Sequence, residues 1–158
     1  MSRFWSDIVS DLEPYVPGEQ PSGGSVLKLN TNESPYPPSP KVMSAIREFS
    51  DVSLSRYPDP LSSKLVASLA KRFDVSSDHI FVGNGSDEVL AHAFNGLLRH
   101  GTPLRFPDIT YGFYSVWALL YKLDTLIVPV SDDFTISVDD YLSVDGPIVI
   151  ANPNAPTG

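Results

Sequence analysis

The segment Gly83-Asn84-Gly85-Ser86-Asp87-Glu88 has the residue types and order that suit a phosphate group. It follows an apolar run, Ile80 to Val82, and it opens a stretch with helical periodicity. The start of a helix offers free backbone N–H groups and a partial positive charge, both of which favour phosphate. Gly85 permits close approach of the backbone, and the hydroxyl of Ser86 can add a hydrogen bond. The alternative is an ordinary helix start that Ser86 caps.

The composition of this loop narrows the kind of phosphate ligand. No Lys-Ser or Lys-Thr pair follows the glycines, as a nucleotide P-loop requires, and the full Gly-x-Gly-x-x-Gly of a dinucleotide site is absent. A small cofactor that carries a phosphate therefore fits better than a nucleotide.

Two later segments also follow predicted strands. Tyr111-Gly112 comes after Leu104 to Phe106, and Asn152 to Gly158 comes directly after the apolar run Pro147 to Ile150. Ligands of open α/β sheets bind at the carboxyl ends of the strands, so both segments are candidates for one site. The ring of Tyr111 could stack on a planar cofactor, or it could pack in the core.

Other reactive residue types give no site. The chain has no cysteine, which excludes disulfides and thiolate metal sites. His79, His92 and His100 lack the spacing of metal ligands. Asp132-Asp133 reads as a polar turn. No metal site is predicted.

Apolar periodicity predicts the elements that position these segments. Ser39 is expected to cap a helix with Pro40 at its first position. From residue 80 onward strands and helices alternate, which favours an α/β fold whose mostly parallel sheet has helices on both faces. The predicted helices cover about 4–12, 40–49, 61–73, 86–98, 111–121 and 137–142, and the predicted strands 80–82, 104–106, 125–130 and 148–151.

Composition limits the partners and the compartment. The 158 residues include 19 acidic and 11 basic side chains, a net charge of −8, which argues against binding to nucleic acid or to an anionic membrane. No stretch approaches the roughly 18 apolar residues of a membrane span, and no secretory signal is visible. We expect a cytoplasmic protein.

In combination and in order, these segments carry a resemblance to a known family. The chain resembles the amino-terminal part of fold-type I pyridoxal-phosphate aminotransferases, and most closely the histidinol-phosphate aminotransferase branch. The residues that carry the resemblance are Tyr15-Val16-Pro17-Gly18, Leu29 to Tyr36, Arg56-Tyr57-Pro58-Asp59, Gly83 to Glu88, Tyr111-Gly112 and Asn152 to Gly158.

The resemblance implies a domain organisation. Residues 1–73 would form an amino-terminal arm and a small-domain segment, and residues 74–158 would form the first part of the cofactor-binding large domain, which would be incomplete. It also implies a homodimer, because Tyr57 would reach the phosphate of the partner's cofactor.

The resemblance further implies roles for individual residues toward pyridoxal 5'-phosphate. Gly85 and the backbone N–H groups of Ser86 and Asp87 would hold the phosphate, and Tyr111 would stack on the pyridine ring. Tyr15, Asn32 and Glu33 would border the substrate pocket.

The terminal turn departs from the pattern of the family at one position. In the family an Asn that stands directly before Pro-Thr-Gly contacts the phenolic oxygen of the cofactor. Here Ala155 occupies that position, with Asn154 one residue earlier and Asn152 two residues before that. Either asparagine could supply the contact, or the contact could be absent. We favour Asn154.

The implied activity is a transamination between histidinol phosphate and a 2-oxo acid, in histidine biosynthesis. The Schiff-base lysine of the family would lie beyond Gly158, so no catalytic residue is assigned, and the chain alone is expected to be inactive. None of the five lysines, Lys64 after two serines included, has the family's context. A phosphothreonine decarboxylase, an aromatic aminotransferase of the same fold, and a non-catalytic phosphate-binding module are the alternatives.

Overall fold

The computed structural model describes residues 3–13, 18, 19, 23, 27–49 and 54–158. Contacts divide the chain into two compact units, Met1–Glu13 with Asp78–Gly158, and Pro14–Ser77. We describe each unit by itself and call them the sheet unit and the helical unit. The predicted boundary at residues 73 and 74 concerns domains of a whole enzyme and stays a prediction.

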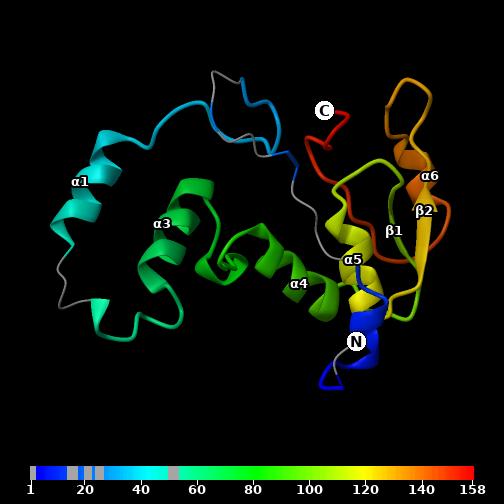
Figure 1. Cartoon of the computed structure of the whole chain (residues 1–158), viewed down its shortest axis with the longest axis horizontal. Helices are drawn as coiled ribbons and strands as arrows, with labels where there is room; N and C mark the ends of the chain where they lie inside the picture. The colour runs from blue at the N-terminus through cyan, green and yellow to red at the C-terminus, as the bar shows by residue number, and fades with distance from the viewer. Residues whose placement is uncertain (1–2, 14–17, 20–22, 24–26, 50–53) are drawn as a thin grey trace. The chain divides into compact units, whose positions relative to one another are not determined.

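The sheet unit is built on two parallel strands (Figure 1). Strand β1, Leu104–Pro107, pairs with β2, Thr125–Val128, in a register that places Leu104 beside Thr125. The connection between them contains helix α5, Phe113–Leu120, so the three elements form a β-α-β unit. Parallel strands need such a crossover. The predicted α/β class is confirmed.

Two predicted strands differ from the structure. Residues 80–82 form neither helix nor strand. Along residues 148–151 the pairing is limited to a bridge between Ile148 and Arg105, which the hydrogen bonds from Arg105 N to Pro147 O (3.0 Å) and from Val149 N to Arg105 O (2.9 Å) close. A β-strand is defined by its hydrogen bonds to a neighbouring strand. An apolar run in the sequence does not show whether such a neighbour is present.

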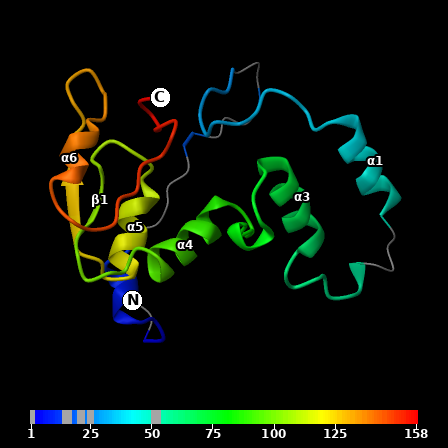
Figure 2. The same cartoon turned by 180° about the vertical axis from the view of Figure 1, so that it is seen from behind.

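The core of the sheet unit lies between β1, α5 and helix α4, Ser86–Gly96 (Figure 2). Its fully or almost fully buried members are Phe94, Leu104, Phe106, Tyr114 and Ala118. The ring of Tyr114 stacks on Phe94 at 5.8 Å and meets Phe106 edge-on at 6.0 Å. Burial raises the pKa of the Tyr114 hydroxyl. This cluster anchors α4 and α5, the helices whose amino-terminal ends form the candidate site.

Three shorter helices are also described. The 3₁₀-helix η1 covers Asp7–Ser10, η2 covers Ser77–His79 and α6 covers Val138–Leu142. The predicted amino-terminal helix is thus a single short turn, and α5 begins two residues later than Tyr111. None of the described helices is long and apolar enough to cross a bilayer.

The helical unit contains α1, Pro40–Glu48, and α3, Ser63–Phe73. The predicted cap of α1 is confirmed, because Ser39 Oγ accepts a hydrogen bond from Lys41 N at 3.3 Å and Pro40 is the first helical residue. Helix α3 begins differently. Asp59 accepts from Leu61 N at 3.0 Å and from Ser63 N at 2.7 Å, so a carboxylate satisfies one of the free donors at the helix start and one in the turn before it.

Candidate functional site

Gly85 occupies the position that precedes helix α4. Its φ of +90° lies in the region that glycine enters without strain, and Ser86 is the first helical residue. The expectation that Ser86 caps the helix is therefore wrong, because Gly85 takes that place and leaves the Ser86 side chain exposed. No side chain caps α4, so its first N–H groups are left without a side-chain acceptor at the helix start.

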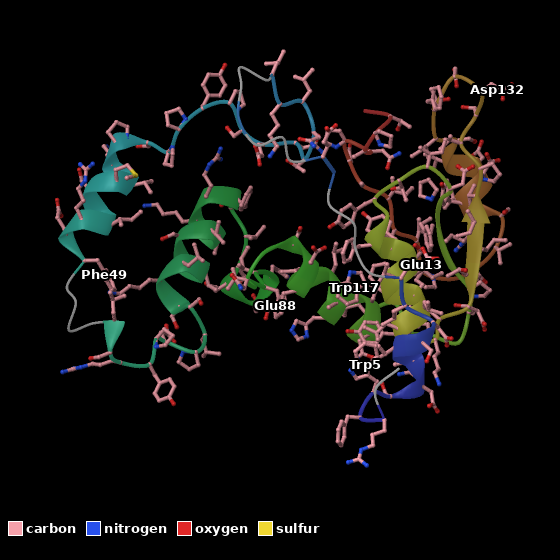
Figure 3. The ribbon with its side chains drawn as sticks, in the orientation of Figure 1. Trp5, Glu13, Phe49, Glu88, Trp117 and Asp132 are labelled. Atoms are coloured by element: carbon pink, nitrogen blue, oxygen red, sulfur yellow. The ribbon has the colours of Figure 1, made fainter. Side chains whose placement is uncertain are left out.

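The loop before α4 already holds an anionic group. Asn84 N donates a hydrogen bond to Glu88 Oε2, and Gly85 N donates to Gly83 O at 3.0 Å. Figure 3 marks Glu88 on α4. A Cβ added to Gly85 would meet no atom within 4 Å, so the space beside this glycine is open. The N–H groups of Asn84 and Gly85 are therefore both used within the chain, and the room for a ligand lies beside Gly85, next to the first N–H groups of α4.

Tyr111 is joined to the same helix start. Its hydroxyl donates to Asp87 Oδ1 at 2.7 Å. The ring, which is half-buried, lies nearly parallel to Phe113 at 5.7 Å and edge-on to Tyr114 at 5.7 Å. Tyr111 therefore belongs partly to the aromatic packing, as the alternative reading of the sequence expected. It is also joined to the loop before α4 through Asp87, which brings two predicted site residues together.

Asn154 lies in the terminal turn and is 5% exposed. Its Nδ2 donates to Ile109 O at 2.8 Å and to Thr157 Oγ1 at 2.9 Å, and its Oδ1 accepts from Thr110 Oγ1 at 2.7 Å. Both amide hydrogens are therefore used inside the chain. The predicted contact with a cofactor oxygen would require one of these bonds to break, and that contact stays a prediction.

A cavity of about 550 Å³ opens beside the terminal turn. Asn152, which is exposed, and Asn154 both line it. Its other walls come from two short segments, residues 133–138 and residues 150–158. Both asparagines considered from the sequence therefore border one space within the sheet unit.

The remaining predicted residues belong to the helical unit. Tyr57 is fully exposed, and Asn32 is exposed with a φ of +50°. Glu33 pairs with Lys28 at 2.5 Å, and this hydrogen bond and positive charge lower the pKa of the Glu33 carboxyl. Tyr15 lies outside the described residues. The roles predicted for these four residues stay predictions.

Sequence reasoning missed the residues that hold the site in place. Thr110 and Thr157 bond Asn154, and the sequence predicted a contact for neither of them, although Thr157 belongs to the Pro-Thr-Gly of the terminal turn. The one signal for Thr110 is its place directly before Tyr111.

Arg105 was also missed, since an arginine within an apolar strand gives no hint of its contacts. It is 2% exposed, and its guanidinium donates to Tyr141 O and to Gly146 O, the latter at 2.6 Å. These bonds fix the chain on either side of residues 142–145, at the end of α6. They therefore support the segment that leads to the terminal turn.

Comparison with protein families and known proteins gives consistent results. The family described as aminotransferase class I and II matches residues 24–158. Histidinol-phosphate aminotransferase 1 of Burkholderia pseudomallei (strain K96243) is 57% identical over the whole chain, and the match covers 45% of that protein. Histidinol-phosphate aminotransferase 1 of Methylococcus capsulatus is 53% identical, with 44% of its length covered. The chain thus spans less than half the length of these curated relatives.

A solved structure resembles the fold. The crystal structure of a protein described as an aminotransferase from Burkholderia pseudomallei K96243 aligns with a TM-score of 0.66 and 23% identity. The alignment covers 81% of this chain and 39% of that one. At this identity the likeness concerns the fold alone.

Proposed function

We propose that the protein containing this chain, which belongs to the class I and II aminotransferases, is a pyridoxal 5'-phosphate-dependent transaminase. Its amino donor would be histidinol phosphate and its acceptor a 2-oxo acid, which would place it in histidine biosynthesis. The names of the curated relatives support this substrate. The observation that carries the proposal is the bond from Tyr111 to Asp87, which holds an aromatic ring beside an uncapped helix start.

The donor set at this position fits the cofactor. The free N–H groups of Ser86 and Asp87 at the start of α4 suit a phosphate, and Gly85 leaves room for it. The Tyr111 ring offers a flat surface, and an offset stack contributes about 1 kcal/mol. Pyridoxal phosphate, when bound, supplies the electron sink for amino-group transfer.

The residues of this chain would bind the cofactor and orient it. The loop would fix the phosphate end, and Tyr111 would set the plane of the ring. In a proposed homodimer Tyr57, which is fully exposed in the helical unit, would reach the cofactor phosphate of the second copy. Glu33, Asn32 and Tyr15 would contribute to the substrate pocket. The lysine that forms the Schiff base is proposed to lie in the part of the protein beyond these 158 residues. A cytoplasmic location stays a prediction.

The test is turnover by the full-length protein loaded with pyridoxal phosphate. We expect it to convert L-histidinol phosphate and 2-oxoglutarate to the corresponding ketone phosphate and glutamate, measured by chromatography, and to be much slower with phenylalanine or tyrosine. Release of carbon dioxide from phosphothreonine would instead indicate the decarboxylase. Cofactor binding without turnover of any of these donors would contradict the proposed transamination.

A further inference from the structure

We infer that Asn154 is a positioning residue that couples the terminal turn to the loop carrying Tyr111. The inference rests on the proposed function, in which Tyr111 stacks on the cofactor. It assigns Asn154 a different role from the direct contact with the cofactor that the sequence favours.

The side-chain hydrogen bonds of Asn154 join two segments of the chain, the loop at residues 109–110 and the terminal turn. Two of its partners, Ile109 and Thr110, stand directly before Tyr111, and they are 45 and 44 residues away in the sequence. The third, Thr157, lies within the terminal turn, and Gly158 N donates to Asn154 O at 2.6 Å. One buried amide thus fixes the turn internally and ties it to the loop.

The chemistry of the amide explains why it suits this role. Ile109 O needs a donor, and Thr110 Oγ1 donates to an acceptor, so the partner must offer both kinds of group. A buried asparagine side chain offers two donors and an acceptor. Aspartate would place a second oxygen against Ile109 O, and alanine would leave buried polar groups unpaired.

The consequence concerns the position of Tyr111. If the Asn154 bonds are lost, the loop of residues 109–111 loses its tie to the turn, and the ring loses part of its fixed orientation. Cofactor binding then falls, although Asn154 itself touches no cofactor atom. A direct ligand would behave differently, because the threonines that bond it would matter little.

The experiment is a double-mutant cycle in the full-length protein with Asn154→Ala, Thr110→Val and the combined variant. Unfolding by denaturant is measured without cofactor, and pyridoxal phosphate affinity by titration. We expect Thr110→Val to weaken the affinity about fivefold, as loss of one buried hydrogen bond does, and Asn154→Ala to weaken it more. The combined variant should equal Asn154→Ala. The exposed residues Thr125 and Asn95 provide matched controls, as Thr125→Val and Asn95→Ala.

A second readout separates positioning from contact. The pH midpoint of the visible absorption of bound cofactor should stay within about half a unit in all variants, since no group on the ring is changed. A shift of about one unit or more in Asn154→Ala, with Thr110→Val unaffected in affinity, would overturn the inference. If Asn154→Ala does not fold, Thr110→Val and Thr157→Val test the same bonds.

The two proposals fail in different ways. Failure of the unmodified protein to bind pyridoxal phosphate would overturn the proposed function together with the positioning role. Normal binding by the unmodified protein and undiminished binding by Thr110→Val would overturn the positioning role alone. Additive effects on unfolding in the absence of cofactor would also contradict it, because they would show that Thr110 and Asn154 are not coupled.

Discussion

The hydroxyl of Tyr111 donates a hydrogen bond to Asp87 Oδ1 across 2.7 Å. It joins the loop after β1 to the first turn of α4, two segments that are 24 residues apart in the sequence. The carboxylate of Asp87 is itself favoured in the first turn of a helix. The flat ring and the exposed N–H groups are therefore held at a fixed separation before any ligand arrives.

Replacing Tyr111 by phenylalanine tests this link. The variant keeps the ring and removes the hydroxyl, so Asp87 loses a donor. We expect about fivefold weaker binding of pyridoxal phosphate to the full-length protein, which corresponds to about 1 kcal/mol. Titration of the cofactor measures it. The same change at Tyr36, which is 80% exposed, is the control. Equal affinity in the two variants would show that the hydroxyl does not support the site.

Replacing Gly85 by alanine tests the helix start. The φ of +90° and ψ of 167° put Gly85 in a region that other residues scarcely enter, so alanine there is strained by about 1–3 kcal/mol, although the space around it is open. Affinity for pyridoxal phosphate should fall at least about fivefold, while affinity for pyridoxal, which lacks the phosphate, should change little. Gly96→Ala, at the end of the same helix, is the matched control and should stabilise by about 0.5 kcal/mol. Equal losses for both ligands would argue against a phosphate contact.

The carboxyl of Asp59 makes the start of α3 sensitive to acid. Hydrogen bonds from Ser63 and Leu61 lower its pKa in the folded chain. The ionised group therefore stabilises α3 above the ordinary pKa of aspartate, about 3.9, and this stabilisation is lost as the pH falls through the lowered value. Asp59→Asn should reduce the loss of helical signal between neutral and acid pH. Circular dichroism during an acid titration measures it, with Asp145→Asn as control. An identical titration in both variants would refute the capping role.

Removing the guanidinium of Arg105 should destabilise the sheet unit. Arg105→Met keeps an unbranched stem out to the position of Nε but leaves the carbonyls of Tyr141 and Gly146 without their donors. We expect a loss of about 2–4 kcal/mol in the free energy of unfolding. Denaturant unfolding of the full-length protein gives the value. The exposed Arg99, changed to Met, should lie within about 0.5 kcal/mol of the unmodified protein. A stability gain in Arg105→Met would mean that burial of the charge outweighs its bonds.

Much of the fold could be predicted because it is encoded locally. Ser39 and Pro40 mark a helix start through their own side chains, and Leu104 and Phe106 belong to a short buried segment with a proline on each side. The pattern failed where structure depends on distant partners. Ile80 to Val82 have the composition of a strand, but the described chain gives them no pairing. Residues 148–151 meet their neighbour at Ile148 alone.

The residue types of the candidate site could be predicted from the sequence, but the hydrogen bonds that join them could not. The glycines of the loop and the aromatic ring are visible in the sequence, because backbone freedom and ring shape are properties of single residues. The contacts of Asn154 with Ile109 and Thr110 cross more than forty residues, so no local pattern contains them. The hydrogen bond from Asn84 N to Glu88 likewise depends on the conformation of the loop, which the spacing of the residues does not specify.

The bonds of Arg105 have a consequence for the order of folding. Its guanidinium meets Tyr141 O and Gly146 O, which lie 36 and 41 residues further along the chain. Strand β1 cannot complete these contacts during synthesis until β2 and α6 have left the ribosome. Closing a loop of this length costs chain entropy before the hydrogen bonds form and offset that cost. The terminal turn would then settle in a late step, after the aromatic cluster of α4 and α5 has formed.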